Sequence, residues 1–302
     1  MYIVDMHCDS LLTVSGECGL VNNYNYSQNH PQLQFDAMFC PKGSSSPEER
    51  RRKIIQYLNV YLSECERLGL AQVKCGRDVF RVTDDGVRAA LLSIEGGGGL
   101  FADSEELRML CDAGLSVFGL AWDNNELSAS AWDDIDTGLT EEGRRMISHL
   151  SDKGVIIDVS HMSDRSFYET LELTSMPVVA THSNFRDICP SPRNLTLNMA
   201  EKIAARGGVI GINIYPPFLK EESACMDDVL RHIDYGLERL GEYAIGFGFD
   251  IDGTDGRYPI GIDINRSIHD QVIDMLLSHY SHSTVERIAG LNVIDFLKNN
   301  LP

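Results

Sequence analysis

Three histidines and three carboxylates each follow a short apolar run of the sequence, and together they could build a metal centre. The six residues are His7, Asp9, Glu95, His161, His182 and Asp250. Imidazole nitrogens mixed with carboxylate oxygens suit Zn²⁺ or a similar divalent ion. A lone histidine of this kind is more often a hydrogen-bonded structural residue. The prediction therefore depends on the coincidence of six such groups, which would be costly to crowd together unless a cation neutralised them.

The stretch "IVDMHCDSLLTV" at residues 3–14 predicts how the first ligands are presented. In an extended segment residues i and i+2 point the same way, so His7 and Asp9 can face one ion while Cys8 points into the wall of the fold. Glu95 could bridge two ions, with His161 and His182 holding the second. Two ions spaced at ~3.5–4 Å would share a water and lower its pKa, which would make hydroxide available near neutral pH.

The elements that must position these residues form a repeating pattern of strand and helix. Helices are expected at 47–69, 104–114 and 140–154, and others are expected to begin at Ser163, Asn198, Glu222 and Ser267. Apolar, β-rich runs alternate with them at 2–6, 32–39, 89–95, 115–122, 154–160, 177–182, 208–214 and 243–250.

Eight strand-and-helix units predict an α/β fold of the closed (β/α)8 TIM type, formed by one domain over residues 1–302. An open doubly wound sheet is disfavoured because no GxGxxG turn follows the first run. Chemistry in such barrels sits at the carboxyl ends of the strands. The six residues, together with Trp122 and Asp123, all lie at those ends.

Composition and charge exclude several classes of function. The chain has 26 basic and 45 acidic residues and a net charge of −19, which would repel nucleic acid and anionic membrane surfaces. No run reaches the ~18 apolar residues of a spanning helix, and no secretory signal is present, so a cytoplasmic location is expected. The eight cysteines lack CxxC spacing and are expected to be reduced thiols.

Six segments resemble signatures of one family, in its order and spacing and over nearly the whole chain: "DMHCD", "SIEGG", "IDVSHMS", "THSNFRDICPSPRNLT", "GVIGINIYPPFL" and "IGFGFDIDG". The family is that of the renal, or membrane, dipeptidases, which are binuclear zinc peptidases with an amidohydrolase-like barrel. The resemblance implies two Zn²⁺ per chain, with another divalent ion as the alternative. It assigns His7, Asp9 and Glu95 to one ion and Glu95, His161 and His182 to the other.

The resemblance also implies roles for two further residues. Arg193 would pair with the carboxylate of the substrate, a task that suits a guanidinium, whereas the plain alternative is a surface arginine after a Pro-rich turn. Asp250 would move a proton between the attacking water and the leaving amine. The plain alternative for Asp250 is a structural partner of nearby backbone, although Asp252 is the better turn former.

The sequence departs from the renal enzymes at three places. Trp122 aligns where those enzymes have a histidine that steadies the oxyanion, so that role would pass to a zinc ion or another donor. The run Gly96–Gly99 stands where a histidine occurs, and it permits close backbone approach or forms only a flexible loop. The membrane anchor of the animal enzymes is expected to be absent, since no apolar tail follows "DFLKNNLP".

The resulting prediction is a zinc-dependent dipeptidase that cleaves dipeptides with a free C-terminal carboxylate by attack of metal-bound hydroxide. The resemblance implies tolerance of a D-residue at that end, a site that includes Trp122, and a homodimer. One alternative keeps the metal site but takes another amide, a lactone or an ester. The other is a non-catalytic barrel that binds peptide or metal.

Overall fold

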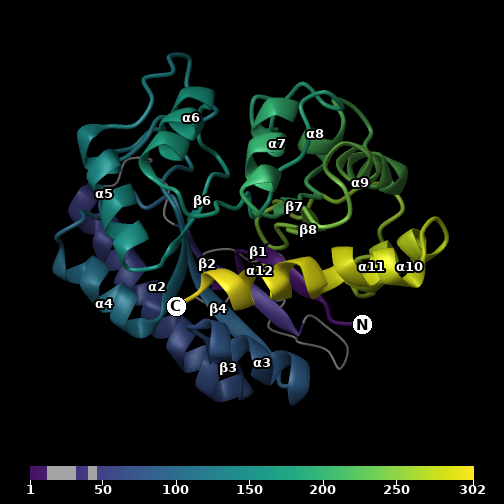
Figure 1. Cartoon of the computed structure of the whole chain (residues 1–302), viewed down its shortest axis with the longest axis horizontal. Coiled ribbons are helices and arrows are strands. Elements are labelled where there is room, and N and C mark those ends of the chain that lie inside the picture. The colour runs from purple at the N-terminus through teal and green to yellow at the C-terminus, as the bar shows by residue number, and fades with distance from the viewer. Residues whose placement is uncertain (12–31, 40–45) are drawn as a thin grey trace.

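The computed structural model describes residues 1–11, 32–39 and 46–302, and it shows a curled parallel sheet surrounded by helices (Figure 1). The predicted α/β barrel is confirmed. Its strands are β1 (Val4–Cys8), β2 (Leu33–Phe39), β3 (Ala71–Val73), β4 (Ala89–Glu95), β5 (Leu115–Gly119), β6 (Ile156–Asp158), β7 (Ile210–Ile212) and β8 (Ile245–Phe247). All of these pair in parallel, in the order β6-β5-β4-β2-β1-β8-β7 with β3 beside β4.

The ring is closed between β6 and β7 by the segment around Val179. Two isolated parallel bridges, Asp158 to Val179 and Ala180 to Ile210, link this segment to its neighbours. The Val159 N–H donates to the Val179 carbonyl at 2.8 Å. The strand predicted at 177–182 is therefore reduced to single-residue bridges, because the Thr181 N–H turns to the side chain of Asp158 instead of continuing the ladder.

Strand β3 was not predicted from the sequence. It pairs with Ala89–Leu91 at the start of β4, whereas β5 pairs with the later residues of β4. The three residues of β3 lie outside any longer apolar run, whereas the equally short β6, β7 and β8 lie within runs of seven or eight residues.

Most of the helices cover the outside of the barrel, and long connections precede several of them, such as residues 120–140 and 248–267. The helices are α2 (Pro47–Leu68), α3 (Gly76–Asp84), α4 (Glu105–Ala113), α5 (Glu141–Asp152), α6 (Asp164–Leu173), α7 (Leu197–Ala205), α8 (Pro216–Leu219), α9 (Met226–Leu240), α10 (Ile268–Leu277), α11 (His282–Glu286), the π-helical turn η1 (Arg287–Leu291) and α12 (Asn292–Asn300).

Capping residues explain where the predicted helices begin. The side chains of Ser104, Thr140, Ser163 and Ser267 each accept a hydrogen bond from a backbone N–H of the first turn, which satisfies a donor that the helix itself leaves unpaired. Helix α9 begins at Met226, later than the prediction at Glu222.

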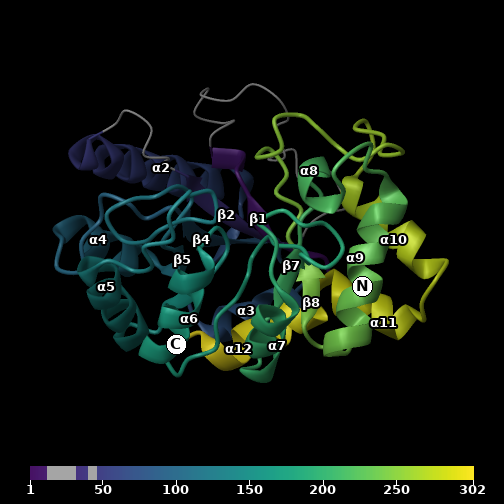
Figure 2. The same cartoon turned by 90° about the horizontal axis from the view of Figure 1, so that it is seen from above.

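One end of the barrel is closed by α12. Its residues Val293, Ile294 and Leu297 form one buried cluster with interior side chains of the strands, such as Val4 and Phe35. Figure 2 shows α12 at the end of the barrel opposite α2 and α8. The carboxyl ends of the strands, where the predicted site lies, are therefore left open.

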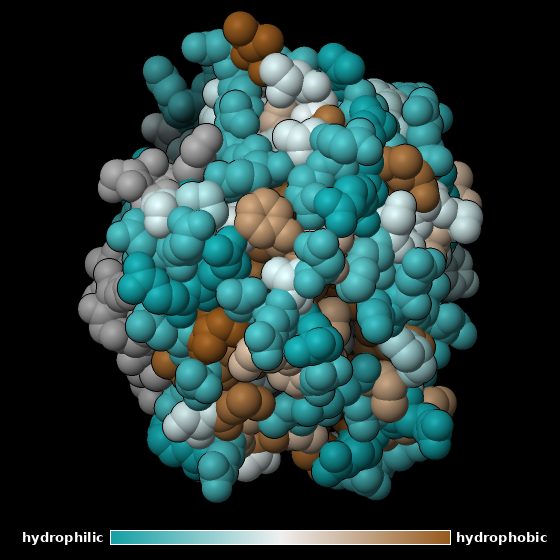
Figure 3. All heavy atoms as spheres, turned by 90° about the vertical axis from the view of Figure 1, so that its left-hand side faces the viewer, coloured by the Kyte–Doolittle hydropathy of each residue, from teal (hydrophilic) through white to brown (hydrophobic). Residues whose placement is uncertain are grey.

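The outer face over α4 and α5 is largely hydrophilic, with scattered apolar side chains (Figure 3). No helix among the described residues is long and apolar enough to cross a membrane. The cysteines at 8, 65, 75, 111, 189 and 225 are free thiols, as predicted, and Cys18 and Cys40 lie outside the described residues.

Candidate metal centre and its pocket

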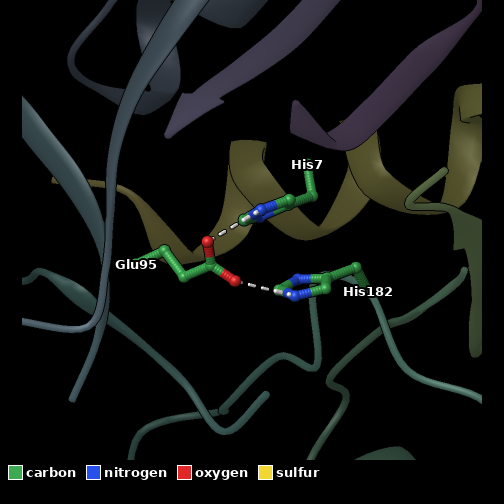
Figure 4. Close-up of side chains that lie close together, drawn as sticks. All are labelled: His7, Glu95 and His182. Atoms are coloured by element: carbon green, nitrogen blue, oxygen red, sulfur yellow. Dashed lines mark ion pairs between the residues drawn. The ribbon is translucent and has the colours of Figure 1, made fainter. Parts of the chain in front are cut away.

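Glu95, the last residue of β4, lies between histidines from three different parts of the barrel. Its Oε1 is 2.8 Å from Nε2 of His161 and 3.0 Å from Nε2 of His182. Its Oε2 is 3.6 Å from Nε2 of His7. Figure 4 shows the two carboxylate oxygens directed to His7 and His182. The two oxygens thus face two different sets of nitrogen atoms, as a carboxylate shared by two cations must.

His7 faces two further carboxylates. Its Nε2 lies 3.8 Å from Oδ1 of Asp9 and 3.9 Å from Oδ1 of Asp250. Nε2 of His7 and Oδ1 of Asp9 are buried and have no hydrogen-bond partner within the described ranges. Buried polar atoms are rarely left unpaired. Nitrogen and carboxylate oxygens turned toward one space without hydrogen bonds fit a divalent metal ion, and zinc is suited to these donors.

The alternation predicted for "HCD" is confirmed. The Cys8 thiol lies apart from the imidazole cluster and donates to the carbonyl of Ile251 at 3.1 Å. Asp9 directly follows β1, so the pleat presents His7 and Asp9 on one side.

Unusual backbone geometry brings the later residues into the site. His161 and Asp250 adopt left-handed φ values of 67° and 59°, which are uncommon for residues other than glycine. A Cβ on Gly253 would lie 2.1 Å from Oδ1 of Asp250 and 2.6 Å from Oδ2 of Asp9. A glycine at 253 is therefore required for the two carboxylates to approach the same space.

Burial shifts the titration of the cluster toward neutral forms. Burial raises the pKa of Glu95 to about 8, although the nearby Arg193 lowers it. Burial likewise raises the pKa of Asp250 to about 7, although the nearby His7 lowers it. Burial lowers the pKa values of His161 and His182 well below 6.5. Without added positive charge, the folded protein thus resists ionising these carboxylates.

A cavity of about 780 Å³ opens above the cluster and is bordered by Asp9, Glu95, His161 and Asp250. Trp122, predicted as a substrate contact, lies in its wall, with its ring 6.0 Å from that of His161 and 5.0 Å from that of Phe39. The other side chains of the wall are Lys53, Tyr57, Asp123, Trp132, Tyr215, Phe218, Asp252 and Asp255.

Most of this wall could not be predicted from the sequence. Lys53 and Tyr57 belong to α2, which the sequence indicated only as a helix, and Trp132 lies in a loop without a motif. Tyr215 and Phe218 lie in "IYPPFL", which carried the family resemblance but no assigned role.

Arg193 is buried, at 3% exposure, so the alternative of a surface arginine is wrong. Its two terminal nitrogens donate to Oγ of Ser183 and to the carbonyl of His182, each at 3.0 Å. Its Nε has no partner among the described residues. Arg193 does not border the large cavity, and its guanidinium lies 5.7 Å from the ring of Phe218, which does.

The glycine run after Glu95 is a packed turn. A Cβ on Gly97 would lie 2.1 Å from the ring of Phe118, and one on Gly98 would lie 2.7 Å from Cβ of Asn125. The buried Arg50 donates from Nε to the Gly98 carbonyl at 3.2 Å. The run Gly96–Gly99 therefore allows close approach of the backbone to its neighbours and is not a flexible loop.

Comparison of the sequence with known families and proteins gives consistent matches. The family described as "Membrane dipeptidase (Peptidase family M19)" matches residues 1–300. An uncharacterized Klebsiella pneumoniae protein from the pqqA 5′ region is 34% identical over 236 residues, covering 74% of this chain and 86% of its own. The dipeptidase tcpJ of Claviceps purpurea is 30% identical over 226 residues, covering 73% of this chain but only 53% of its own.

Solved structures share the fold over the full length. A dipeptidase described as a metallopeptidase of family M19 superposes with a TM-score of 0.87 at 23% identity, covering 100% of this chain and 99% of its own. A metallopeptidase from Rhodobacter sphaeroides gives 0.86 at 23% identity, covering 99% of both chains.

The metal-free protein should lose stability as the pH rises from about 6.5 to about 8.5. Glu95 and Asp250 bind protons more tightly in the folded state, with pKa values of about 8 and about 7, so the free energy of unfolding falls until both have titrated. The lowered pKa values of His161 and His182 affect the free energy of unfolding only below pH 6.5, outside this range. Thermal unfolding at several pH values measures the effect.

Zinc-loaded protein is the control, because bound cations neutralise the same carboxylates and bind the folded state. It should unfold at a higher temperature with a flatter dependence on pH. Equal pH slopes with and without zinc would contradict the assignment of these carboxylates to a cation site.

Proposed function

The chain belongs to the membrane dipeptidase family, peptidase family M19, and on that premise we propose that it hydrolyses dipeptides with a free C-terminal carboxylate. Membership makes it a metallo-dipeptidase. The observation that carries the proposal is Glu95, whose two oxygens face separate groups of histidines at the floor of the cavity.

Two ligand sets follow from this arrangement. His7, Asp9 and Glu95 would hold one zinc ion, and Glu95, His161 and His182 would hold the second. Ions held there supply a Lewis acid for the peptide carbonyl and a nucleophile at neutral pH. The protein contributes the fixed positions of the ligands, since three of the five residues, His7, Asp9 and Glu95, lie within or directly after β1 and β4.

Asp250 is proposed to carry the proton. Its Oδ1 faces the cluster, 3.9 Å from Nε2 of His7, while its Oδ2 accepts a hydrogen bond from the Asn213 amide at 3.0 Å. Asn213 therefore holds the carboxyl group in one orientation. A pKa raised to about 7 by burial suits a group that takes a proton from water and returns it to the leaving nitrogen.

The cavity walls suit a small peptide. Trp122 and Phe39 form an aromatic edge on one side. On a second side the ring of Phe218 contacts the rings of Trp132 and Tyr215. Such walls favour apolar side chains and exclude water from the reacting bond. The Rhodobacter metallopeptidase is described with a phosphinate mimic of L-Ala-D-Ala, which supports including L,D-dipeptides among the substrates.

Two cations are candidates for holding the substrate carboxylate. Arg193 is our first choice, because its unpaired Nε and its position beside Phe218 place a buried positive charge next to the cavity. Lys53 borders the cavity itself. The position of Arg193 off the cavity wall favours, as a second candidate function, hydrolysis of a neutral amide, lactone or ester at the same centre.

A dipeptide panel tests the proposed function. Zinc-loaded protein should cleave L,L- and L,D-dipeptides, and amidating the substrate C-terminus should lower kcat/KM by about ten- to a hundredfold, the worth of one charge-assisted hydrogen bond. The control is protein stripped with a chelator and reloaded. Turnover of amides or lactones that exceeds that of free dipeptides would establish the second function instead.

The variants Arg193→Ala and Lys53→Ala distinguish the two cations. If Arg193 holds the carboxylate equally in the ground and transition states, its loss should raise KM by about ten- to a hundredfold and leave kcat nearly unchanged. Amidated and free substrates should then be cleaved alike. The Lys53 variant should keep the discrimination, and the opposite pattern in the two variants would assign the carboxylate to Lys53.

The variant Asp250→Asn keeps the shape of the side chain but cannot take up a proton. We expect kcat to fall by about 10²- to 10⁴-fold, the usual worth of general acid–base catalysis, with zinc content unchanged by elemental analysis. Asp252→Asn is the matched control, since Asp252 also borders the cavity. Near-parental turnover of Asp250→Asn, or loss of its zinc, would exclude Asp250 as the proton carrier.

A further inference from the structure

A hydroxyl group beneath the cluster connects two of the proposed zinc ligands to a buried carboxylate. Oγ1 of Thr181 lies 2.8 Å from Nδ1 of His182 and 3.5 Å from Nδ1 of His7. The same oxygen lies 2.5 Å from Oδ2 of Asp158, the last residue of β6. The rings of His7 and His182 stack at 3.7 Å. One hydroxyl thus touches a histidine from each ligand set.

Counting hydrogens gives the direction of these bonds. Thr181 has one hydroxyl hydrogen, and it goes to Oδ2 of Asp158, because a carboxylate only accepts. Oγ1 must then act as acceptor toward His182, so the imidazole hydrogen is on Nδ1. The longer contact to His7 has the same direction. Each imidazole consequently turns an Nε2 without hydrogen toward Glu95.

Backbone hydrogen bonds fix the carboxylate of Asp158. Its Oδ1 accepts hydrogen bonds from the backbone N–H groups of Ser160 at 2.9 Å and Thr181 at 3.0 Å. These bonds join β6 to the segment that closes the barrel. The position of the carboxylate, and the direction in which Thr181 donates, are therefore set by the closure of the ring.

We infer that Asp158 and Thr181 are positioning residues that fix His182, and with it His7, in the Nδ1–H tautomer, leaving each Nε2 lone pair for a metal ion. Neither residue is among the proposed ligands, and neither borders the cavity. The inference rests on the proposed function, because the Nε2 atoms left without hydrogen are those assigned to zinc. Hydrogen-bonded partners of metal-binding histidines set ring orientation and tautomer in this manner.

The sequence contained a weak signal for this pair. Asp158 lies in "IDVSH" and Thr181 directly precedes His182 in "ATHSN". Spacing alone does not show that residues 23 apart share a hydrogen bond, so the assignment required the structure.

Four variants test the inference. Thr181→Val removes the hydroxyl at nearly constant volume, and Thr181→Ser restores it. Asp158→Asn places an amide donor beside Oγ1, so Thr181 should donate to His182 and drive the imidazole hydrogen to Nε2. Thr170→Val is the matched control, because it also removes a buried, hydrogen-bonded threonine hydroxyl, in α6.

The first measurement uses metal-free protein. Long-range ¹H–¹⁵N spectra of histidine-labelled protein report the tautomer of each ring, with the His182 signals assigned by their loss in His182→Asn. We expect Nδ1–H for His182 in the parent, Thr181→Ser and Thr170→Val, a mixture in Thr181→Val, and Nε2–H in Asp158→Asn. A merely structural role of Asp158 would not produce the reversal.

The second measurement is zinc affinity by competition with a chelator of known strength. Loss of such a supporting contact typically weakens metal binding by about 10- to 100-fold. We expect this for Thr181→Val and Asp158→Asn, with parental affinity in Thr181→Ser and Thr170→Val. Circular dichroism confirms that each variant is folded, and Asp158→Asn keeps the test decisive if Thr181→Val does not fold.

The two measurements separate this inference from the proposed function. If the protein binds zinc and cleaves dipeptides but His182 has the same tautomer and the same affinity in all variants, the positioning role is overturned. If the tautomers change as expected but the parent shows no zinc-dependent hydrolysis, the hydrogen-bond chain stands and the proposed function fails.

Discussion

Three carboxylates are buried together at one end of the barrel, and the surrounding structure is built to accommodate their like charges. Asp9, Glu95 and Asp250 are all shielded from water, and each lies within 4 Å of the same imidazole nitrogen, Nε2 of His7. A low-dielectric interior does not tolerate several unpaired carboxylates. Two divalent ions would carry four positive charges against these three carboxylates, and the remainder would attract an anionic substrate. The buried Arg193 adds to the same positive potential.

Several features far from the reacting atoms serve this arrangement. Helix α12 fills the opposite end of the barrel with apolar side chains, so the polar residues are confined to one end. Gly253 leaves the space in which two carboxylates meet, and Gly97 allows the loop after Glu95 to pack on Phe118. The left-handed backbone of His161 directs its ring to the same point. The site is therefore assembled from strand ends and from loops whose shape the barrel fixes.

The barrel and the grouping of the candidate metal-site residues could be predicted because both depend on local patterns. Apolar runs of strand length indicate strands, and in a parallel barrel the residue after each strand reaches the same rim. His7, Glu95 and His182 could be found in this way. Strand β3 could not, since its three residues lie outside any longer apolar run, whereas the equally short β6, β7 and β8 lie within runs of seven or eight residues. The segment around Val179 proved to be a pair of bridges because Thr181 bonds Asp158 instead of a neighbouring strand.

The walls of the cavity and the contacts beneath the ligands could not be predicted, because they join residues distant in the sequence. Lys53 lies on a helix that borders the cavity. Hydrogen bonds to Ser183 and His182 hold Arg193 beside the ring of Phe218. The chain from Asp158 through Thr181 depends on the closure of the ring. Tertiary contacts of this kind have no periodic signature in the sequence.

The position of Glu95 between the histidines is explained if its carboxylate bridges two metal ions. Anomalous diffraction from zinc-loaded crystals, recorded on both sides of the zinc absorption edge, would locate such ions. We expect two peaks separated by ~3.5–4 Å, one beside each oxygen of Glu95, with His7 next to one peak and His161 and His182 next to the other. A single peak, or two peaks that do not share Glu95, would show that Glu95 is not a bridge.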